Sequence, residues 1–340
     1  MAVRSGLMPN KLMIVPSIEY FFGGIRNEEN LLDIMNRFKF GDIANIFLTR
    51  MGGVAVEFLA NGPLRSIERL NYRGDGEIPD FIMENHDRVV ELHGQRVNFA
   101  NFISAALFGR IAVLRHRSLA MTQYVGMNDI LAFSTRGNTI ITEKSEFADR
   151  IFYPKIILVR RNPKYVDVID KSHIEDAIMF LDHIRERQME LEELNIESCI
   201  VMNYQAAILH NQQHFSGSLS LNFAVAEALV HEILLAHGLV SSVVRKPFAK
   251  TDHNICPISM RKFKDMRFKS RIVLLNDAQL INRYQFCILE SARNCRNNLM
   301  HGANLVSPRQ SGDMQTAVRD LWNHVVDLPF ALIASWSMRI

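Results

Sequence analysis

Apolar residues recur at helical spacing through most of the second part of the sequence, from residue 196 to residue 340. The clearest case is the segment 219–239, where Phe223, Leu229 and Ile233 belong to an apolar pattern with a period near 3.6. A glycine near its end suits the left-handed cap that ends many helices. Further helices are expected over residues 199–210, 260–275, 277–301 and 314–336, the last one broken near Pro329. Helices joined by polar loops, such as residues 210–218, predict an all-α helical bundle for residues 196–340.

Two segments of the first part of the sequence have strand patterns. Val54, Val56 and Phe58 alternate with other residues, which is typical of a strand with one buried face. The apolar run 151–159 is typical of a buried strand, and residues 165–169 are its expected hairpin partner.

Three other segments of the first part have helical spacing, namely residues 31–38, 99–114 and 176–194. Strand and helix patterns are therefore mixed before residue 195 and largely helical after it. We expect an α+β domain over residues 1–195, with a sensory or regulatory role, followed by the helical domain over residues 196–340.

The composition is that of an ordinary globular protein, with 340 residues and 48% hydrophobic residues, which is long enough for two domains. The net charge of +3 is compatible with an RNA partner without being diagnostic of one. No apolar stretch is expected to reach the length of a membrane span, and the first residues lack the apolar core of a secretory signal. The four cysteines form no CxxC pair and are typical of reduced thiols. We therefore expect a cytoplasmic protein with no membrane partner.

The segment 296–301 carries the strongest chemical signal. It reads Arg-Asn-Asn-Leu-Met-His and is followed by Gly302. The planar fork of Arg296 suits a phosphate because it donates paired hydrogen bonds and keeps its charge. His301 titrates near neutrality, so it can take or give a proton during phosphodiester cleavage. Asn297 is four residues before His301 and shares its helix face.

This segment resembles the Arg-x4-6-His signature of the HEPN superfamily, which includes many ribonucleases of toxin–antitoxin, CRISPR-associated and anti-phage systems. The helical segment 221–229, with Glu227 among apolar residues, looks like the opening helix of such domains. The resemblance covers roughly residues 196–340 and extends to the order of the helices.

The resemblance implies a metal-independent endoribonuclease with no cofactor that acts as a toxin or an abortive-infection effector. Arg296 would bind the scissile phosphate, Asn297 would orient the phosphate or the histidine, and His301 would act as general base or acid. The products would carry 2′,3′-cyclic phosphate and 5′-OH ends. The resemblance also implies a homodimer through the HEPN domain, in which two copies of the motif form one composite site. An alternative is a non-catalytic HEPN domain that binds RNA or a partner protein.

Further residues are candidates for supporting roles. Glu227 could form an ion pair that positions Arg296, or it could simply belong to a polar seam of the core. Arg293 lies one turn before the motif and could hold a second phosphate, although a surface role is equally compatible. A basic run is the predicted RNA-binding surface, with a solvated helix face as the alternative; its residues are Arg261, Lys262, Lys264, Arg267, Lys269 and Arg271.

The motif residues, and the pair His210 and His214, also have simpler interpretations. An arginine and a histidine at a helix C-terminus also stabilise the negative end of the helix dipole. His210 and His214 have a spacing that occurs at zinc sites, but they lie in a segment with no recognised zinc pattern. We therefore expect no metal site.

Overall fold

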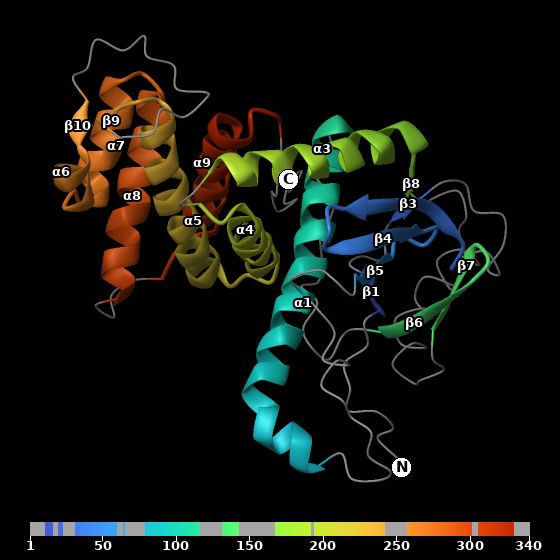
Figure 1. Ribbon diagram of the computed structural model, residues 1–340. Helices are drawn as coiled ribbons and strands as arrows, with labels where there is room; N and C mark the ends of the chain where they lie inside the picture. The colour runs from blue at the N-terminus through green and yellow to red at the C-terminus, as the bar shows by residue number, and fades with distance from the viewer. Residues whose placement is uncertain are drawn as a thin grey trace. The chain divides into compact units, whose positions relative to one another are not determined.

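The computed structural model describes residues 11–15, 20–22, 31–59, 64, 79–115, 131–142, 167–191, 194–241, 257–300 and 305–329 (Figure 1). The chain divides into two compact units. The first contains Met1–Leu107 and Thr122–Ile178, and the second contains Phe108–Met121 and Met179–Ile340. The predicted domain boundary near residue 195 stays a prediction.

A curled antiparallel sheet forms the centre of the first unit (Figure 1). Its strands follow the order β3-β4-β5-β1-β6-β7. They comprise β1 (Lys11–Ile14), β3 (Ile34–Phe40), β4 (Ala44–Thr49), β5 (Val54–Phe58), β6 (Leu131–Arg136) and β7 (Thr139–Thr142). The two edges of the sheet also meet, because Ile34 N donates to Asn138 O at 2.8 Å and Ile140 N donates to Leu32 O at 3.0 Å. These bonds bring β3 and β7 together and cover edges that would otherwise be open.

Buried side chains fill both sides of this sheet. One cluster includes Met13, Phe47 and Phe133, and the last two rings meet edge to face at 6.0 Å. On another side, Phe40 packs against Phe99 of α1 (Pro79–Leu114) with ring centroids 5.6 Å apart. Because these rings are buried, the helix and the sheet share one apolar core.

The outcome of the strand and helix predictions in this unit is mixed. The strand at residues 54–58 and the buried helix at residues 99–114 are confirmed as β5 and part of α1. The helix expected at residues 31–38 is wrong, because residues 34–40 form β3, which pairs with β4 through a tight turn at Gly41 (φ 51°). In so short a segment the apolar spacing fits both periods, and cross-strand pairing decides the outcome.

Two short strands lie outside the main sheet. β2 (Tyr20–Phe22) pairs in parallel with β8 (Asp167–Ile169). The segment 165–169 was expected to pair as a hairpin with residues 151–159, and these latter residues lie outside the described part of the chain.

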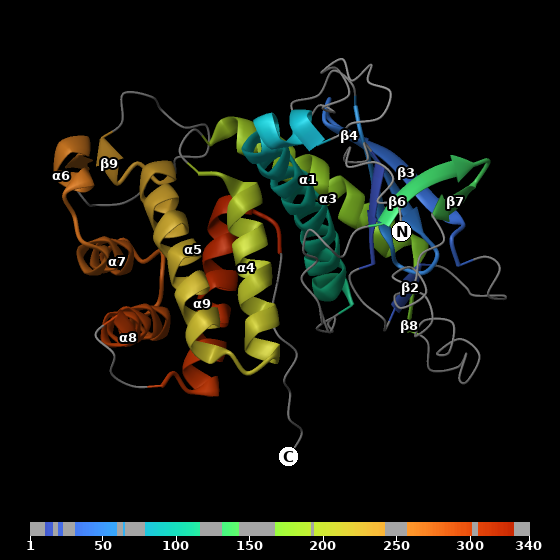
Figure 2. The same ribbon diagram turned by 90° about the horizontal axis from the view of Figure 1, so that it is seen from below.

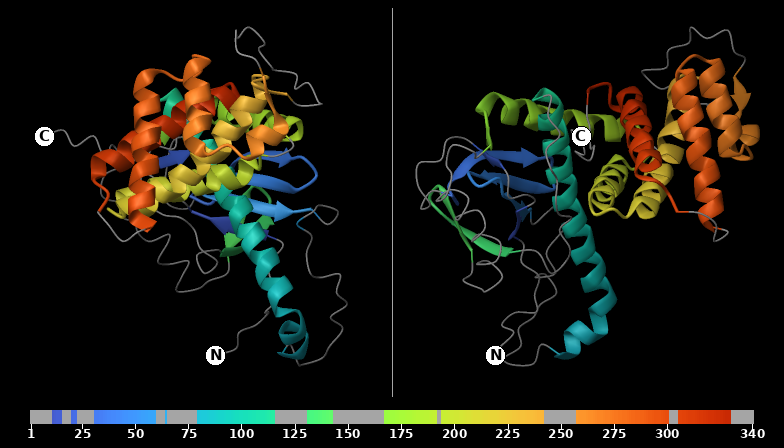
Figure 3. Two further views of the ribbon diagram at one scale, coloured as in Figure 1. Left: turned by 90° about the vertical axis from the view of Figure 1, so that its left-hand side faces the viewer. Right: turned by 180° about the vertical axis from the view of Figure 1, so that it is seen from behind.

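Helices dominate the described part of the second unit. They are α4 (Ile196–Asn211), α5 (Phe215–Ala236), α6 (Met260–Lys264), α7 (Phe268–Asp277), α8 (Arg283–Met300) and α9 (Pro308–Val326), and α3 (Lys171–Glu190) leads into them. Figure 2 shows α4, α5 and α9 side by side, and Figure 3 shows α7 beside α8. α5 contacts α4, α7, α8 and α9, so the strongest helical pattern of the sequence belongs to the central helix of this group.

This unit also contains a pair of short parallel strands, β9 (Val240–Ser241) and β10 (Ile258–Ser259). The fold is therefore mixed α+β, as expected, but an all-α arrangement of residues 196–340 is not confirmed. The sequence pattern missed these strands because each has only two residues, which is too short for any periodicity.

Several helix boundaries differ from those expected. The single helix predicted over residues 260–275 is divided into α6 and α7 by residues 265–267. The polar loop predicted at residues 210–218 is shorter, because α5 already begins at Phe215. α9 begins earlier than predicted, behind a capping box in which Ser307 and Gln310 satisfy each other's backbone N–H groups.

Two helices are long and apolar enough to span a membrane by length and composition, which corrects the expectation that no stretch reaches that length. They are Val90–Leu114 and Phe215–Ala236. Their apolar windows are 83% and 67% buried inside the protein, which is typical of core helices in globular proteins. The cytoplasmic location and the absence of a membrane partner stay predictions.

Candidate functional site

The motif residues Arg296 and Asn297 lie in the last two turns of α8 and are exposed. The helix is amphipathic, because Leu289 and Ala292 are buried whereas Arg296 and Asn297 are exposed. The predicted proton-transfer residue, His301, lies outside the described residues. Two of the three predicted catalytic residues therefore share one exposed helix end, and the position of the third stays a prediction.

Arg296 is held against an aromatic side chain of the central helix. The carbon of its guanidinium group lies 5.4 Å from the ring centroid of Phe223 on α5. Phe223 is itself fixed, since it is buried and meets the ring of Phe268 at 4.8 Å. Within the described part of the chain, Arg296 forms no hydrogen bond or ion pair. Its stacking leaves its N–H groups available to an incoming acceptor.

Glu227 lies on α5, one turn after Phe223, and is half-buried. Burial raises the pKa of this carboxyl group, and the charges of Arg296 and Arg271 partly oppose the rise. The carboxylate forms no direct hydrogen bond or ion pair with a described residue. The predicted ion pair with Arg296 is therefore an electrostatic interaction across a gap and not a direct contact.

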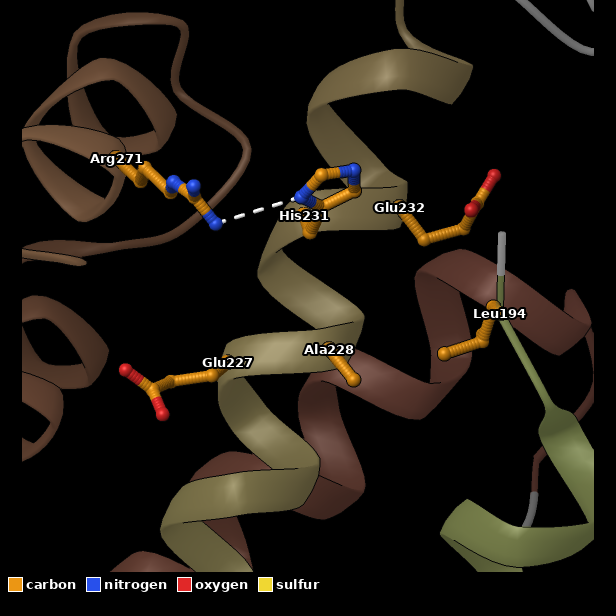
Figure 4. Close-up of a pocket in the computed structure, with 6 residues that line it drawn as sticks. All are labelled: Leu194, Glu227, Ala228, His231, Glu232 and Arg271. Atoms are coloured by element: carbon orange, nitrogen blue, oxygen red, sulfur yellow. Dashed lines mark hydrogen bonds between the residues drawn. The ribbon is translucent and has the colours of Figure 1, made fainter. Parts of the chain in front are cut away.

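A polar pocket of about 290 Å³ lies beside Glu227 (Figure 4). Its lining residues come from α5 and α7 and from the turn before α4. They are Leu194, Glu227, Ala228, His231, Glu232 and Arg271. Figure 4 shows Arg271 and Glu227 on one side of α5, Glu232 and Leu194 on the other, and Ala228 between them.

Arg271 and His231 form a hydrogen-bonded pair at this pocket. Arg271 Nη1 lies 3.3 Å from His231 Nδ1, and since arginine has no acceptor, Nδ1 accepts and the ring proton is on Nε2. Both groups lie 4.7 Å from the ring centroid of Phe263. Arg271 Nε is buried and has no acceptor among the described residues. The pair therefore offers hydrogen-bond donors beside a half-buried carboxylate.

Sequence reasoning missed His231, Glu232 and this pocket. Glu227 and His231 are four residues apart, as are Ala228 and Glu232, so each pair shares one face of α5. These spacings are visible in the sequence, but only the packing of α7 against α5 shows that the residues line a pocket.

The six basic residues of the predicted RNA-binding surface have three different environments. Arg261, Lys262, Lys264 and Arg267 are exposed and have no ion pair with a described residue. Lys269 bonds to Glu290 of α8 at 2.7 Å, and this hydrogen bond lowers the pKa of that carboxyl group. Arg271 turns to the pocket. The four free cations are the ones available to a backbone phosphate.

The remaining candidates have local partners. Arg293 is half-buried, and its Nη2 donates to Asn294 Oδ1 at 2.7 Å. His210 is buried, and its Nδ1 lies 2.8 Å from Ser311 Oγ of α9. His214 is the exposed N-cap residue of α5. No group of three metal-ligating side chains occurs among the residues that the structure describes.

No protein-family model, curated protein or solved structure matches this chain.

Proposed function

We propose that this protein is a metal-independent endoribonuclease of the HEPN type, with residues 196–340 as its catalytic domain. One observation carries the proposal most directly. Arg296 is stacked on Phe223 next to exposed Asn297, and its N–H groups have no partner among the described residues. An arginine held in this way is prepared to receive the two oxygens of a phosphate.

The chemistry follows from the groups of the motif. Arg296 binds the scissile phosphate and stabilises the charge that grows on its oxygens. His301 takes the proton of the ribose 2′-OH, or gives one to the leaving 5′-oxygen. Attack of the 2′-oxygen on phosphorus breaks the P–O5′ bond and yields a 2′,3′-cyclic phosphate and a 5′-OH end. Asn297 orients the phosphate or the histidine, and a homodimer supplies two histidines to one cleft.

The test uses the full chain, labelled mixed RNA and EDTA. We expect the wild type to cleave and the Arg296→Ala and His301→Ala variants to lose at least about 100-fold in rate, the typical cost of removing one such group. Arg283→Ala is the matched control, because Arg283 is exposed at the opposite end of α8. Cleavage that persists in both motif variants contradicts the proposal, as does a product without cyclic-phosphate ends.

A second candidate function is RNA binding without cleavage. Four exposed cations without an ion-pair partner among the described residues favour it, because contacts of this kind hold an RNA backbone without cutting it; they are Arg261, Lys262, Lys264 and Arg267. Under this alternative, RNA remains intact, and its affinity falls steeply with salt and is unchanged by His301→Ala.

The cellular role that we propose is that of a cytoplasmic toxin or abortive-infection effector, with the first unit as a sensory or regulatory partner of the nuclease. Expression of the wild type should arrest growth, and the His301→Ala variant should not. Equal toxicity of the two chains contradicts this role.

A further inference from the structure

We propose that the pocket between Glu227 and Arg271 binds a guanine base of the RNA next to the cleavage site. The inference rests on the proposed ribonuclease function for its biological meaning, but the pocket's base preference can be tested without cleavage.

The donors and acceptors of the pocket match the edges of guanine. Guanine presents O6 and N7 as acceptors, and arginine is their commonest partner. Arg271 has a buried Nε–H with no acceptor among the described residues. Guanine also presents N1–H and the 2-amino group as neighbouring donors, and a carboxylate can accept from both. Glu227 has a carboxylate with no hydrogen bond to a described residue.

The same groups disfavour the other purine. Adenine has an amino group where guanine has O6, so it would place a donor against the donors of Arg271. It also lacks the 2-amino group and the N1 proton that Glu227 would accept. A site whose polar groups are left unpaired rejects the wrong ligand strongly.

The shape of the pocket is suitable for a flat base. Ala228, which has only a methyl side chain, lies between the two sides of the pocket (Figure 4). The volume of about 290 Å³ is near the lower end of the range for small-molecule sites, which suits one base better than a whole dinucleotide. Arg271 contacts both His231 and the ring of Phe263, so this recognising group is held in place before a ligand arrives.

The position of the pocket connects it to the phosphate site. Glu227 interacts electrostatically with Arg271 at the pocket and with Arg296 at the motif, so one carboxylate lies within range of both arginines. A nucleotide whose base occupies the pocket therefore has its phosphate near the motif end of α8. Single-stranded RNA is commonly read in this way, with an unstacked base bound by its edges.

The experiment measures binding of GMP, IMP and AMP to the full chain by titration calorimetry in EDTA. The three ligands carry the same phosphate, so differences between them report the base alone. We expect GMP to bind at least about tenfold more tightly than AMP, with IMP between them because it lacks only the 2-amino group. Equal affinities for GMP and AMP, or no binding of GMP, overturn the proposal.

Two variants test the assignment to this pocket. Ala228→Phe should fill it and lower GMP affinity at least about tenfold, whereas Ala224→Phe, at an exposed position one turn earlier on α5, should not. Arg271→Lys loses the forked donors and should reduce the preference for GMP over AMP, with Arg283→Lys as its control. Unchanged GMP binding in both pocket variants overturns the assignment, provided that each variant melts like the wild type.

Measurements of nucleotide binding and of RNA cleavage together distinguish failure of the guanine pocket from failure of the proposed ribonuclease function. Selective GMP binding without RNA cleavage leaves the guanine pocket standing and removes the nuclease. Cleavage at all sequences with equal GMP and AMP affinity leaves the nuclease standing and removes the guanine pocket.

Discussion

The carboxylate of Glu227 on α5 interacts electrostatically with the guanidinium group of Arg296 on α8, without touching it. Phe223, one turn before Glu227 on the same helix, carries the stacked arginine. α5 thus supplies both the aromatic surface and the negative charge that surround the motif arginine. This relationship connects the central helix to the exposed end of α8, where the proposed chemistry occurs.

The half-buried carboxylate of Glu227 leads to a prediction for the stability of the folded protein. Burial raises its folded pKa above the ordinary 4.5, so charging it costs stability as pH rises through that range. We expect Glu227→Gln to unfold at a higher urea concentration than the wild type at about pH 7, and at the same concentration well below pH 4.5. Glu186→Gln, at an exposed position of α3, is the control. A Glu227→Gln variant that is less stable at about pH 7 contradicts the prediction.

Gly53 is expected to resist replacement by alanine. A Cβ atom there would collide with the buried side chain of Met13 and come within 2.8 Å of Thr49 Oγ1, which already accepts a hydrogen bond from Gly53 N. Overpacking of this kind costs about 1–3 kcal/mol. Urea unfolding of Gly53→Ala should show a loss in this range.

Gly94 is the matched control for Gly53, because it lies inside α1 and a Cβ atom would meet nothing within 4 Å. Since glycine weakens a helix, Gly94→Ala should stabilise the protein by about 0.5–1 kcal/mol. If Gly53→Ala also stabilised the protein, the collision with Met13 would be relieved by a shift of that side chain, and the prediction for Gly53 would be wrong.

The buried imidazole of His210 should make the folded protein less stable in mild acid. It is buried against Ser311, and burial lowers its pKa below the ordinary 6.5. The unfolded chain therefore takes up a proton first, so the stability that is present above pH 6.5 is lost as pH falls from 6.5 towards the folded pKa. Urea midpoints between about pH 8 and about pH 5 should fall less in His210→Gln than in the wild type.

The control for His210 is His214→Gln, because His214 is exposed four residues later. That variant should keep the wild-type dependence of stability on pH. If His210→Gln also keeps it, the buried imidazole is not its source.

Two of the cysteines should differ strongly in reactivity. Burial raises the pKa of the Cys199 thiol to about 11, whereas Cys287 is exposed on α8. Because the thiolate is the reactive form, iodoacetamide at about pH 8 should label Cys287 and spare Cys199. Mass spectrometry of tryptic peptides measures both sites, and a sample unfolded in urea should show both labelled. Comparable labelling of Cys199 in the folded protein would disprove the prediction.

Local patterns were sufficient for several elements of this fold. The alternation at Val54, Val56 and Phe58 predicted β5, and the apolar period of residues 219–239 predicted most of α5, because each pattern expresses the geometry of its own element. The left-handed backbone at Gly238 (φ 67°) was also readable from the residue type. Arg296 and Asn297 were found as neighbours on an amphipathic segment for the same reason.

Tertiary structure decided the rest. Residues 31–38 fit a helical period, yet residues 34–40 form β3, because pairing with β4 outweighs the weak preference of a short segment. The bonds from Ile34 and Ile140 that join the sheet edges involve backbone groups, which carry no mark in the sequence.

The candidate site divides in the same way. The sequence by itself determined the motif residues and their helix, because the chemistry of a side chain and the period of a helix are local properties. Only the packing of α7 and α8 on α5 brought Arg271 to His231 and Arg296 to Phe223. Contacts between segments far apart in the chain depend on how whole helices fit together, and no pattern within a single segment contains that information.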